Sequence, residues 1–356
     1  MTTSARKSGV RREVTGAEVP RLLETNALGG YTPIITRLGF PTPFDVRDRY
    51  GVGALFPNKS KRTGVYLLVL TDGFFYIGLA KDVVRRFSQH RKHFAGRLIG
   101  LAFQQHPLNA IDEIESRLIR QGEKLGLPLE QSEWKSHVYG AADLDEIIDE
   151  AEYARWNADP ATAFRADQWP PQKVEAGRRS RDDQNFRRLM SIADTDRLVA
   201  SLRHYVMSCI PAAKRTAADY WNIACLPSTN RSSSPRLICL SAHVMELLVI
   251  GQNEDDPATV GGFFICARST LESAYGSLRS AGRKLDVAIH TDRPYKSAGV
   301  DQCRVDFESL EAFDALLKTT AVRDAIAKLV HNVMRKGVNR YAQFHCSTLG
   351  ERILYE

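Results

Sequence analysis

The sequence predicts a mixed α+β or α/β protein that is built from two domains. Its 356 residues exceed the usual length of one domain. Hydrophobic residues make up 43% of the chain and charged residues 26%, which allows a sizeable core and argues against a disordered protein. Apolar, β-prone runs alternate with helical segments in both halves of the chain. We therefore expect a small domain of β-β-α-β-α order, followed by a second α+β domain.

Turn-rich and proline-rich segments divide the chain. The linker between the domains is indicated by Trp169-Pro170-Pro171 and by a change in net charge, from −8 over residues 101–172 to +5 over residues 173–218. The predicted parts are, in order, a flexible basic tail with a loop-rich lead-in, a first domain, a linker and a second α+β domain, at residues 1–60, 61–156, 157–184 and 185–356.

A β-hairpin is the first expected element of the small domain. Two apolar, β-prone runs, residues 64–70 and 74–79, are separated by a Thr-Asp-Gly turn signal. A three-residue loop that ends in a left-handed glycine would pair Leu68 with Tyr76. Because side chains alternate along a strand, this register also brings Tyr66 to the same face of the sheet as Tyr76.

Helices and one more strand complete the small domain. Asp82 can cap the first helix, Pro107 suits the first position of the second helix, and Gly126 lies just beyond its end. The elements expected after the hairpin are a helix, a strand, a helix and a further acidic helix, at residues 83–94, 98–103, 107–124 and 143–156.

The second domain has an α+β pattern that we assign to no family. A helix is predicted over residues 185–210, and Ser269 and Gly282 bracket another helix as a capping box and a C-cap. The stretch 220–222 predicts a polar turn region. The expected strands and final helices lie at residues 236–240, 244–250, 262–266, 285–290, 303–307, 309–318 and 320–336.

Composition excludes several classes of protein. The chain has no uninterrupted run of 18 apolar residues, so neither a transmembrane helix nor a membrane partner is expected. Its start is polar and basic without an apolar segment, which does not fit a secretory signal. The six cysteines are widely spaced and form no C-x-x-C pair, so we expect free thiols rather than a disulfide framework or a zinc ribbon. These features predict a cytoplasmic protein.

Phosphate chemistry is indicated by residues of the hairpin and of the two helices that follow it. Arg86 and His90 are four residues apart, so they share one helical face and place a cation beside a candidate base. Tyr66 and Tyr76 add hydroxyl groups that can move a proton. Glu115 flanks the apolar seam of its own helix, where a carboxylate is costly unless it is paired or bound to a metal.

These residues resemble the signature of the GIY-YIG nuclease family over about residues 62–131. The two short motifs read Gly-Val-Tyr and Tyr-Ile-Gly, and an arginine, a histidine and a glutamate follow in the family's order. The family's later asparagine has no match, and Gln131 in the corresponding stretch offers the same donor and acceptor groups. The matching positions are two motif glycines and five side chains: Gly64, Gly78, Tyr66, Tyr76, Arg86, His90 and Glu115.

The resemblance implies a metal-dependent endonuclease that hydrolyses phosphodiester bonds in DNA, with RNA left open as a substrate. Glu115 would hold one Mg²⁺ or Mn²⁺ ion, and Arg86 would bind the scissile phosphate. Tyr66 would accept a proton with the help of His90, and Tyr76 would orient water or phosphate. Family analogy favours restriction or phage defence, as a homodimer or with other defence proteins, over DNA repair or homing. Further candidates for substrate contact are Lys81, Arg85 and Gln131.

Alternatives stay open at the sequence level. The tyrosines could be core aromatics, Arg86 could be solvated surface, and His90 with His93 could suggest a metal pair, although no third ligand is evident. A non-cleaving nucleic-acid-binding or regulatory protein on the same fold is the alternative function. No phosphate loop or nucleophile elbow supports another enzyme chemistry. The arginine cluster at residues 178–188 could attract phosphate or form a solvated face.

Overall fold

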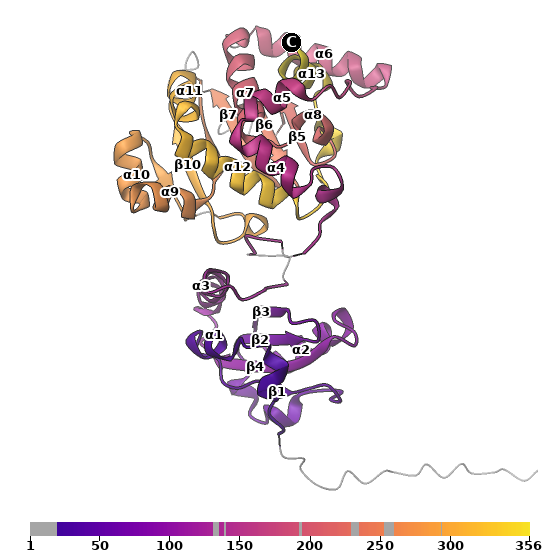
Figure 1. Ribbon diagram of the computed structural model, residues 1–356, viewed down its shortest axis with the longest axis vertical. Coiled ribbons are helices and arrows are strands. Elements are labelled where there is room, and N and C mark those ends of the chain that lie inside the picture. The colour runs from indigo at the N-terminus through magenta and orange to yellow at the C-terminus, as the bar shows by residue number, and fades with distance from the viewer. Residues whose placement is uncertain are drawn as a thin grey trace, which may run out of the picture. The chain divides into compact units, whose positions relative to one another are not determined.

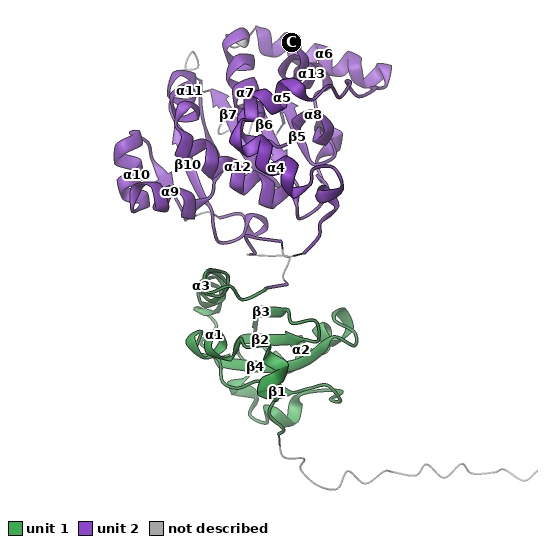
Figure 2. Cartoon of the chain, in the orientation of Figure 1, with its two compact units in different colours: residues 1–128 green, residues 129–356 purple. Residues whose placement is uncertain are grey.

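The computed structural model of the chain separates into two compact units, residues 1–128 (unit 1) and 129–356 (unit 2), shown in green and purple in Figure 2. The described part of the chain is mixed α and β, with one antiparallel sheet in each unit, which confirms the predicted class. The described residues are 20–130, 135–138, 140–191, 194–228, 235–252, 260–292 and 294–356.

Unit 1 is built on a four-stranded antiparallel sheet (Figure 1). Its elements are β1 (Phe44–Asp45), β2 (Gly64–Leu70), β3 (Phe75–Ala80), β4 (Leu98–Gln105), α1 (Thr32–Arg37), α2 (Val83–His93) and α3 (Ile111–Lys124). The strand order is β1-β4-β2-β3, so β2 lies inside the sheet, and all its residues are buried. α3 packs against β2 and β3, and α2 packs against β3.

The hairpin has the predicted register. Leu68 pairs with Tyr76 across β2 and β3, and Gly73 in the loop has a φ of +81°. Tyr66 lies two residues before Leu68 on its strand, so it faces the same side of the sheet as Tyr76. The three-residue loop therefore sets the relative position of the two tyrosines.

The two helices of the predicted β-β-α-β-α order are both present, but one begins later than predicted. Asp82 caps α2, because its carboxylate accepts the backbone N–H of Val84 at 2.9 Å. By contrast, α3 begins at Ile111 and not at Pro107. The Ala110 N–H donates to the Pro107 carbonyl at 3.0 Å, which closes a separate turn before the helix.

Residues before β2 belong to the fold of unit 1 and are more than a loop-rich lead-in. β1 pairs with β4. A 3₁₀ turn over Thr25–Leu28 and the helix α1 bring Leu28 and Ile35 into the core, each 2% exposed. The first 19 residues, which include the predicted basic tail, lie outside the described residues.

Unit 2 contains a six-stranded antiparallel sheet. Its strands are β5 (Trp221–Cys225), β6 (Arg236–Ala242), β7 (Met245–Gln252), β8 (Val260–Cys266), β9 (Ile289–His290) and β10 (Cys303–Phe307). Their order is β5-β6-β7-β8-β10-β9. Four of the five strands predicted here are confirmed, at β6, β7, β8 and β10. The strand expected at residues 285–290 is reduced to β9.

Helices pack against this sheet (Figure 1). The described helices of unit 2 are α4 (Glu150–Ala158), α5 (Pro160–Ala166), α6 (Ala176–Met190), α7 (Thr195–Cys209), α8 (Ala213–Thr216), α9 (Arg268–Tyr275), α10 (Leu278–Leu285), α11 (Leu310–Lys318), α12 (Thr320–Met334) and α13 (Ser347–Tyr355). α12 packs against β6 and β8, while α6 and α13 pack against β5. α7 contacts α11, α12 and α13, so it joins these three helices.

The division between the units differs from the predicted one. Residues 129–156, predicted as the end of the first domain, and the predicted linker at 157–184 belong to unit 2. α5 and part of α6 occupy the linker range. Phe164 on α5 is buried in the core of unit 2, and Asp182 on α6 is buried against Ser347. Burial of these side chains makes the segment part of the domain.

Two predicted helices are each divided because a capping residue begins a new helix inside them. The acidic helix expected at 143–156 is a 3₁₀ turn over Asp143–Glu146 followed by α4, which Asp149 caps. The helix expected at 185–210 is shared between α6 and α7, and Asp194 caps α7. Aspartate favours N-cap positions because its carboxylate satisfies free backbone N–H groups.

Three further predictions in unit 2 are wrong. The expected polar turn around Trp221 is strand β5, and Trp221 is fully buried. The helix expected to end at Gly282 is two helices, since Gly276 has a φ of +82° and ends α9, and Gly282 lies inside α10. The strand at 285–290 is shortened because α10 extends to Leu285.

The structure bears on two further predictions, the state of the cysteines and the length of the apolar helices. All six cysteines lie in unit 2 and are buried and free. Cys266 and Cys303 face each other across β8 and β10, with their Sγ atoms 3.6 Å apart. Within the described ranges, no helix has the length and apolar character needed to cross a membrane.

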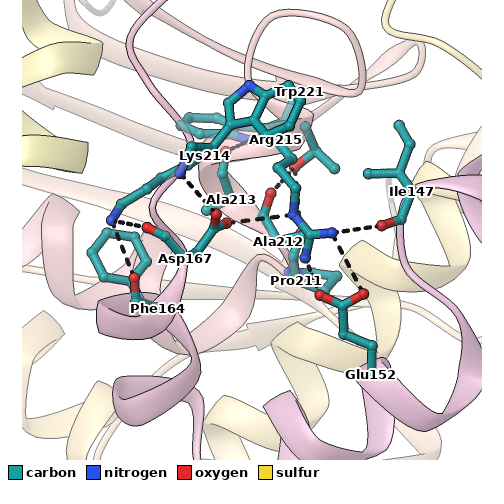
Figure 3. A network of polar contacts seen from close by, with 12 residues as sticks. Ile147, Glu152, Phe164, Asp167, Pro211, Ala212, Ala213, Lys214, Arg215 and Trp221 are labelled. Atoms are coloured by element: carbon teal, nitrogen blue, oxygen red, sulfur yellow. Dashed lines mark hydrogen bonds and ion pairs between the residues drawn. The ribbon is translucent and has the colours of Figure 1, made fainter.

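A polar network fixes α4 and α5 to the rest of unit 2 (Figure 3). The guanidinium of Arg215 lies between the carboxylates of Glu152 and Asp167, and its Nη1 donates to the Ile147 carbonyl at 2.8 Å. Lys214 Nζ donates to the Asp167 carbonyl at 2.6 Å. Glu152, Asp167 and Arg215 border a hollow of about 720 Å³. Because Arg215 pairs with both carboxylates, we assign the network a structural role.

Replacing Arg215 with Ala should destabilise unit 2 by about 2 kcal/mol. The change leaves the carboxylates of Glu152 and Asp167 without their cation, and these side chains are 32% and 14% exposed, between a surface and a buried ion pair. All four tryptophans lie in unit 2, so urea unfolding followed by tryptophan fluorescence measures this unit. Arg155→Ala, an exposed arginine on α4, is the control, and equal stability of the two variants would contradict the structural role.

Candidate active site

The structure brings four of the predicted site residues into one cluster in unit 1. The rings of Tyr66 on β2 and Tyr76 on β3 are stacked, with centroids 6.2 Å apart. The Tyr66 hydroxyl lies 2.5 Å from Nε2 of His90 and 3.2 Å from Nε of Arg86, both on α2. The rings of His90 and Tyr76 have centroids 4.7 Å apart. These four side chains therefore share one site.

The side-chain periodicities of the strands and of α2 bring the four residues of this cluster together. The hairpin register places both tyrosines on one face of the sheet. One helical turn separates Arg86 from His90, and α2 turns Val83, Phe87 and His90 inward. His90 is 6% exposed, whereas Arg86 lies at the exposed edge of the helix. The helix thus presents a buried imidazole and a solvent-accessible guanidinium to the same hydroxyl.

The lack of a side chain at Gly78 leaves space for the Tyr66 hydroxyl. Gly78 pairs with Tyr66 across β2 and β3, and a Cβ atom at Gly78 would collide with the Tyr66 hydroxyl and with the ring of Tyr76. Gly64 is constrained in a similar way, because a Cβ atom there would collide with the backbone carbonyl of Gln104 on β4. Packing therefore requires both motif glycines, one of them at the site itself.

Burial sets the protonation states of the cluster. Burial and, next, Tyr76 raise the pKa of Tyr66 well above its ordinary value, although Arg86 acts in the opposite direction. Burial, with repulsion from Arg86 and His93, lowers the pKa of His90 to about 4. At neutral pH the Tyr66 hydroxyl keeps its proton and His90 is neutral. The hydroxyl therefore donates to Nε2 of His90 and accepts from the Nε–H of Arg86.

Acidification should destabilise unit 1 through His90. The imidazole has a pKa of 6.5 when unperturbed and about 4 in the fold, so the folded state binds fewer protons between these values. Stability is thus fully present above pH 6.5 and falls as the pH falls towards 4, by roughly 3 kcal/mol at about 1.4 kcal/mol for each pKa unit. Hydrogen exchange of the β2 amides, corrected for intrinsic rates, measures this loss for unit 1 alone.

The matched variants for this experiment lie on the same helix. His90→Gln removes the buried imidazole and should abolish most of the loss between pH 6.5 and 4. His93→Gln changes an exposed histidine of α2 and should leave the loss intact. If both variants lose stability with pH as the natural chain does, His90 is not the group responsible.

Glu115 on α3 extends the cluster. Its Oε1 accepts the backbone N–H of Leu79 on β3 at 2.9 Å, and its negative charge adds to the causes that raise the pKa of Tyr66. The apolar residues at i−4, i+3 and i+4 of its helix are buried, so the half-buried carboxylate lies beside the apolar seam. This is the placement that the sequence predicted for a metal-binding glutamate.

The other predicted contact residues are less closely tied to the cluster. Lys81 directly follows β3 and Arg85 lies in the first turn of α2, and both are exposed. Gln131 lies outside the described residues. The structure adds Gln89, whose Oε1 accepts from Nη1 of Arg86 at 2.9 Å. Its i+3 spacing from Arg86 is the signal in the sequence that could have identified it.

A divalent cation would find one carboxylate at this site. In the part of the chain that the structure describes, no three His, Cys, Asp or Glu side chains form a group that could hold a metal. The single carboxylate of Glu115 is enough for Mg²⁺. This ion binds proteins through one or two carboxylates and keeps water molecules and substrate phosphate oxygens as its other ligands. The donor set therefore suits a hydrated cation held together with the substrate.

Family models, curated proteins and solved structures were compared with this chain, and none matches it. The resemblance to the GIY-YIG nucleases therefore rests on the residues described above and stays a prediction.

Proposed function

We propose that unit 1 is a GIY-YIG-like, metal-dependent endonuclease that hydrolyses phosphodiester bonds in DNA. The observation that carries this proposal is the Tyr66 hydroxyl, which donates to neutral His90 and accepts from Arg86. Hydrolysis of a phosphate ester needs an activated water and stabilisation of negative charge. A hydroxyl held between a proton acceptor and a cation is suited to both needs.

Tyr66 and His90 form a route for the proton of the attacking water. The raised pKa of Tyr66 makes the phenolate scarce at neutral pH, so Tyr66 does not act as a base by itself. Its oxygen takes a proton from the water while its own proton passes to Nε2 of His90. Tyr66 is therefore the group that contacts the water, and His90 is the group that holds the proton.

Arg86 supplies the cation that binds the scissile phosphate. Its Nε is fixed by Tyr66 and its Nη1 by Gln89, so the plane of the guanidinium is set before substrate arrives. A fixed guanidinium fork matches the oxygens of a phosphate group. Tyr76 lies beside the same guanidinium and can orient water or phosphate.

Glu115 would hold the Mg²⁺ or Mn²⁺ ion, which when bound would offset negative charge on the phosphate. Lys81 and Arg85 add exposed positive charge near the site for an approaching DNA backbone. In this proposal unit 2 selects the target or partner. The role in restriction or phage defence stays a prediction, because no described residue tests it.

Cleavage of a supercoiled plasmid by the full-length chain tests the proposal. With Mg²⁺ or Mn²⁺ the plasmid should become nicked or linear, and a chelator should stop the reaction. Glu115→Gln protein, purified in parallel, controls for contaminating nucleases. If the folded natural chain binds DNA but cuts neither DNA nor RNA with either metal, the non-cleaving alternative replaces the nuclease.

Gly78→Ala should lower the cleavage rate at least tenfold, about 1.4 kcal/mol of barrier. The new Cβ atom would displace the Tyr66 hydroxyl from its place between His90 and Arg86. Single-turnover cleavage and the melting temperature are measured together. Gly53→Ala is the matched control, because its Cβ atom would meet no other atom within 4 Å. Wild-type cleavage by Gly78→Ala would show that the observed position of the hydroxyl does not matter.

A further inference from the structure

Helix α6 carries five arginines, and the structure divides them into two groups. Arg178 and Arg179 point into unit 2. Arg178 Nη2 donates to the His345 carbonyl at 2.8 Å, and Arg179 Nη1 donates to the Glu351 carboxylate at 2.7 Å. These two side chains anchor α6 to the C-terminal part of the chain. The outer group consists of Arg181, Arg187 and Arg188, which are exposed.

The outer group forms a basic face without a neutralising carboxylate. Among the described residues, none of these three arginines forms an ion pair with an Asp or Glu side chain. The acidic residues of the same helix face the other way. Asp182 accepts from the hydroxyl of Ser347 at 2.6 Å, and Asp183 accepts from the hydroxyl of Thr348 at 2.6 Å. The outward face of α6 therefore keeps three positive charges.

The same face carries a shallow hollow of about 420 Å³. The described residues that line it are all polar or basic: Ser180, Gln184, Arg187, Arg188 and Ser191. Apart from the adjacent pair Arg187 and Arg188, these residues are three or four positions apart, so they form one exposed stripe along the helix. Arg181 is exposed and stands seven residues before Arg188, two helical turns along the same side. Hydroxyl, amide and guanidinium groups are all donors that phosphate oxygens accept from.

We propose that the outward face of α6 binds the sugar–phosphate backbone of duplex DNA. This inference rests on the proposed function of unit 1 and assigns the DNA contact in unit 2 to one helix. Phosphate contacts from Arg, Ser and Gln hold a protein on a duplex without reading its sequence. Positive charge without a protein partner is the complement of that backbone, and the hollow provides donors that can approach it from one side.

Salt dependence of DNA binding tests this assignment. The triple variant R181Q/R187Q/R188Q removes the outward charges and keeps long, helix-forming side chains. The matched control is R279Q/R283Q/K284Q, which removes three exposed charges from α10, another helix of unit 2. Both triples are made in the full-length Glu115→Gln chain with a chelator present, so that duplex DNA is bound without being cut.

The expected result is a lower salt slope for the α6 triple. Each lost phosphate contact lowers the slope of log Kd against log salt by about one, so the slope should fall by about two to three, with at least tenfold weaker binding near physiological salt. The α10 triple should keep the natural slope. Equal slopes for the two triples would overturn the assignment, and so would an α6 effect confined to RNA. If the α6 triple melts early, the three single variants replace it, each expected to lower the slope by about one.

The two proposals fail separately. If the natural chain never cleaves but its DNA binding depends on α6, the nuclease proposal falls and the contact surface stands. If the natural chain cleaves DNA and the α6 triple binds DNA with the affinity and salt slope of its Glu115→Gln parent, the contact surface falls and the nuclease stands.

Discussion

Glu115→Gln should lower the rate of DNA cleavage by about a hundredfold or more, at least roughly 3 kcal/mol of barrier. Glutamine keeps the size of the side chain and can still accept the Leu79 N–H, so the contact that places α3 beside β3 survives. What disappears is the charge that would hold a cation against the phosphate. DNA affinity should be unchanged or slightly higher, because a negative charge near the backbone has been removed.

Asp112→Asn is the matched control for this variant. Asp112 is an exposed acid in the first turn of the same helix, so its neutralisation alters the helix charge without touching the cluster. Melting temperature, DNA affinity and cleavage rate are measured for both proteins. A structural carboxylate would behave differently, since stability, affinity and cleavage would fall together. Near-normal cleavage by a folded Glu115→Gln protein would end the metal-ligand assignment.

Tyr66→Phe should lower the cleavage rate by about two to four orders of magnitude, the usual range for loss of a general acid or base. Phenylalanine fills the same space on β2 but removes the oxygen that would contact the water in the proposed mechanism and the proton that would pass to His90. His90 Nε2 then loses its hydrogen-bond donor inside the protein, which should cost unit 1 about 1–2 kcal/mol of stability.

Two readouts separate chemistry from stability in Tyr66→Phe. Hydrogen exchange of the β2 amides measures the folded fraction of unit 1, and single-turnover cleavage at saturating protein measures the chemical step. Tyr50→Phe is the control, because Tyr50 is 89% exposed and lies outside the cluster. If Tyr66→Phe cleaves at the natural rate while unit 1 stays folded, the proton route proposed through Tyr66 and His90 is wrong.

The hairpin and the helix after it could be predicted closely from the sequence because local rules govern both. The loop length fixes the strand register, which places Leu68 opposite Tyr76. Asp82 is an N-cap that the chain supplies at the start of α2. The alternation of side chains along β2 and the 3.6-residue turn of α2 then bring Tyr66 and His90 together. Strand alternation and helical periodicity are both local properties of the chain.

The start of unit 2 could not be predicted because tertiary contacts determine it. Trp169-Pro170-Pro171 does interrupt the helices, as a linker would. However, Gln172 Nε2 donates to the Ala217 carbonyl at 2.9 Å, which ties the interruption to a distant part of unit 2. Strand β5 was missed for a similar reason. Its residues Trp221–Cys225 are mostly apolar, but the run is only five residues long, and its pairing with β6 and the burial of Trp221 are set by the rest of unit 2.

At the candidate site, too, local sequence patterns could predict the residues but not their protonation states. Sequence patterns identify Tyr66, Arg86, His90 and Glu115, but they do not say which group carries the proton. That follows from burial, which raises the pKa of Tyr66 and lowers the pKa of His90 to about 4. The role of Gln89 likewise appears only when the direction of the Arg86 side chain is known.

The close fit between Gly78 and the Tyr66 hydroxyl has a consequence for how this domain can diverge. As long as position 66 carries a tyrosine, any side chain at position 78 would collide with it. If unit 1 is the proposed nuclease, a lineage that abandons cleavage no longer needs that hydroxyl, so a smaller residue at 66 would permit alanine or serine at 78. Co-variation of these two positions should therefore separate descendants that still cut DNA from descendants that only bind it, even where the rest of both motifs is intact.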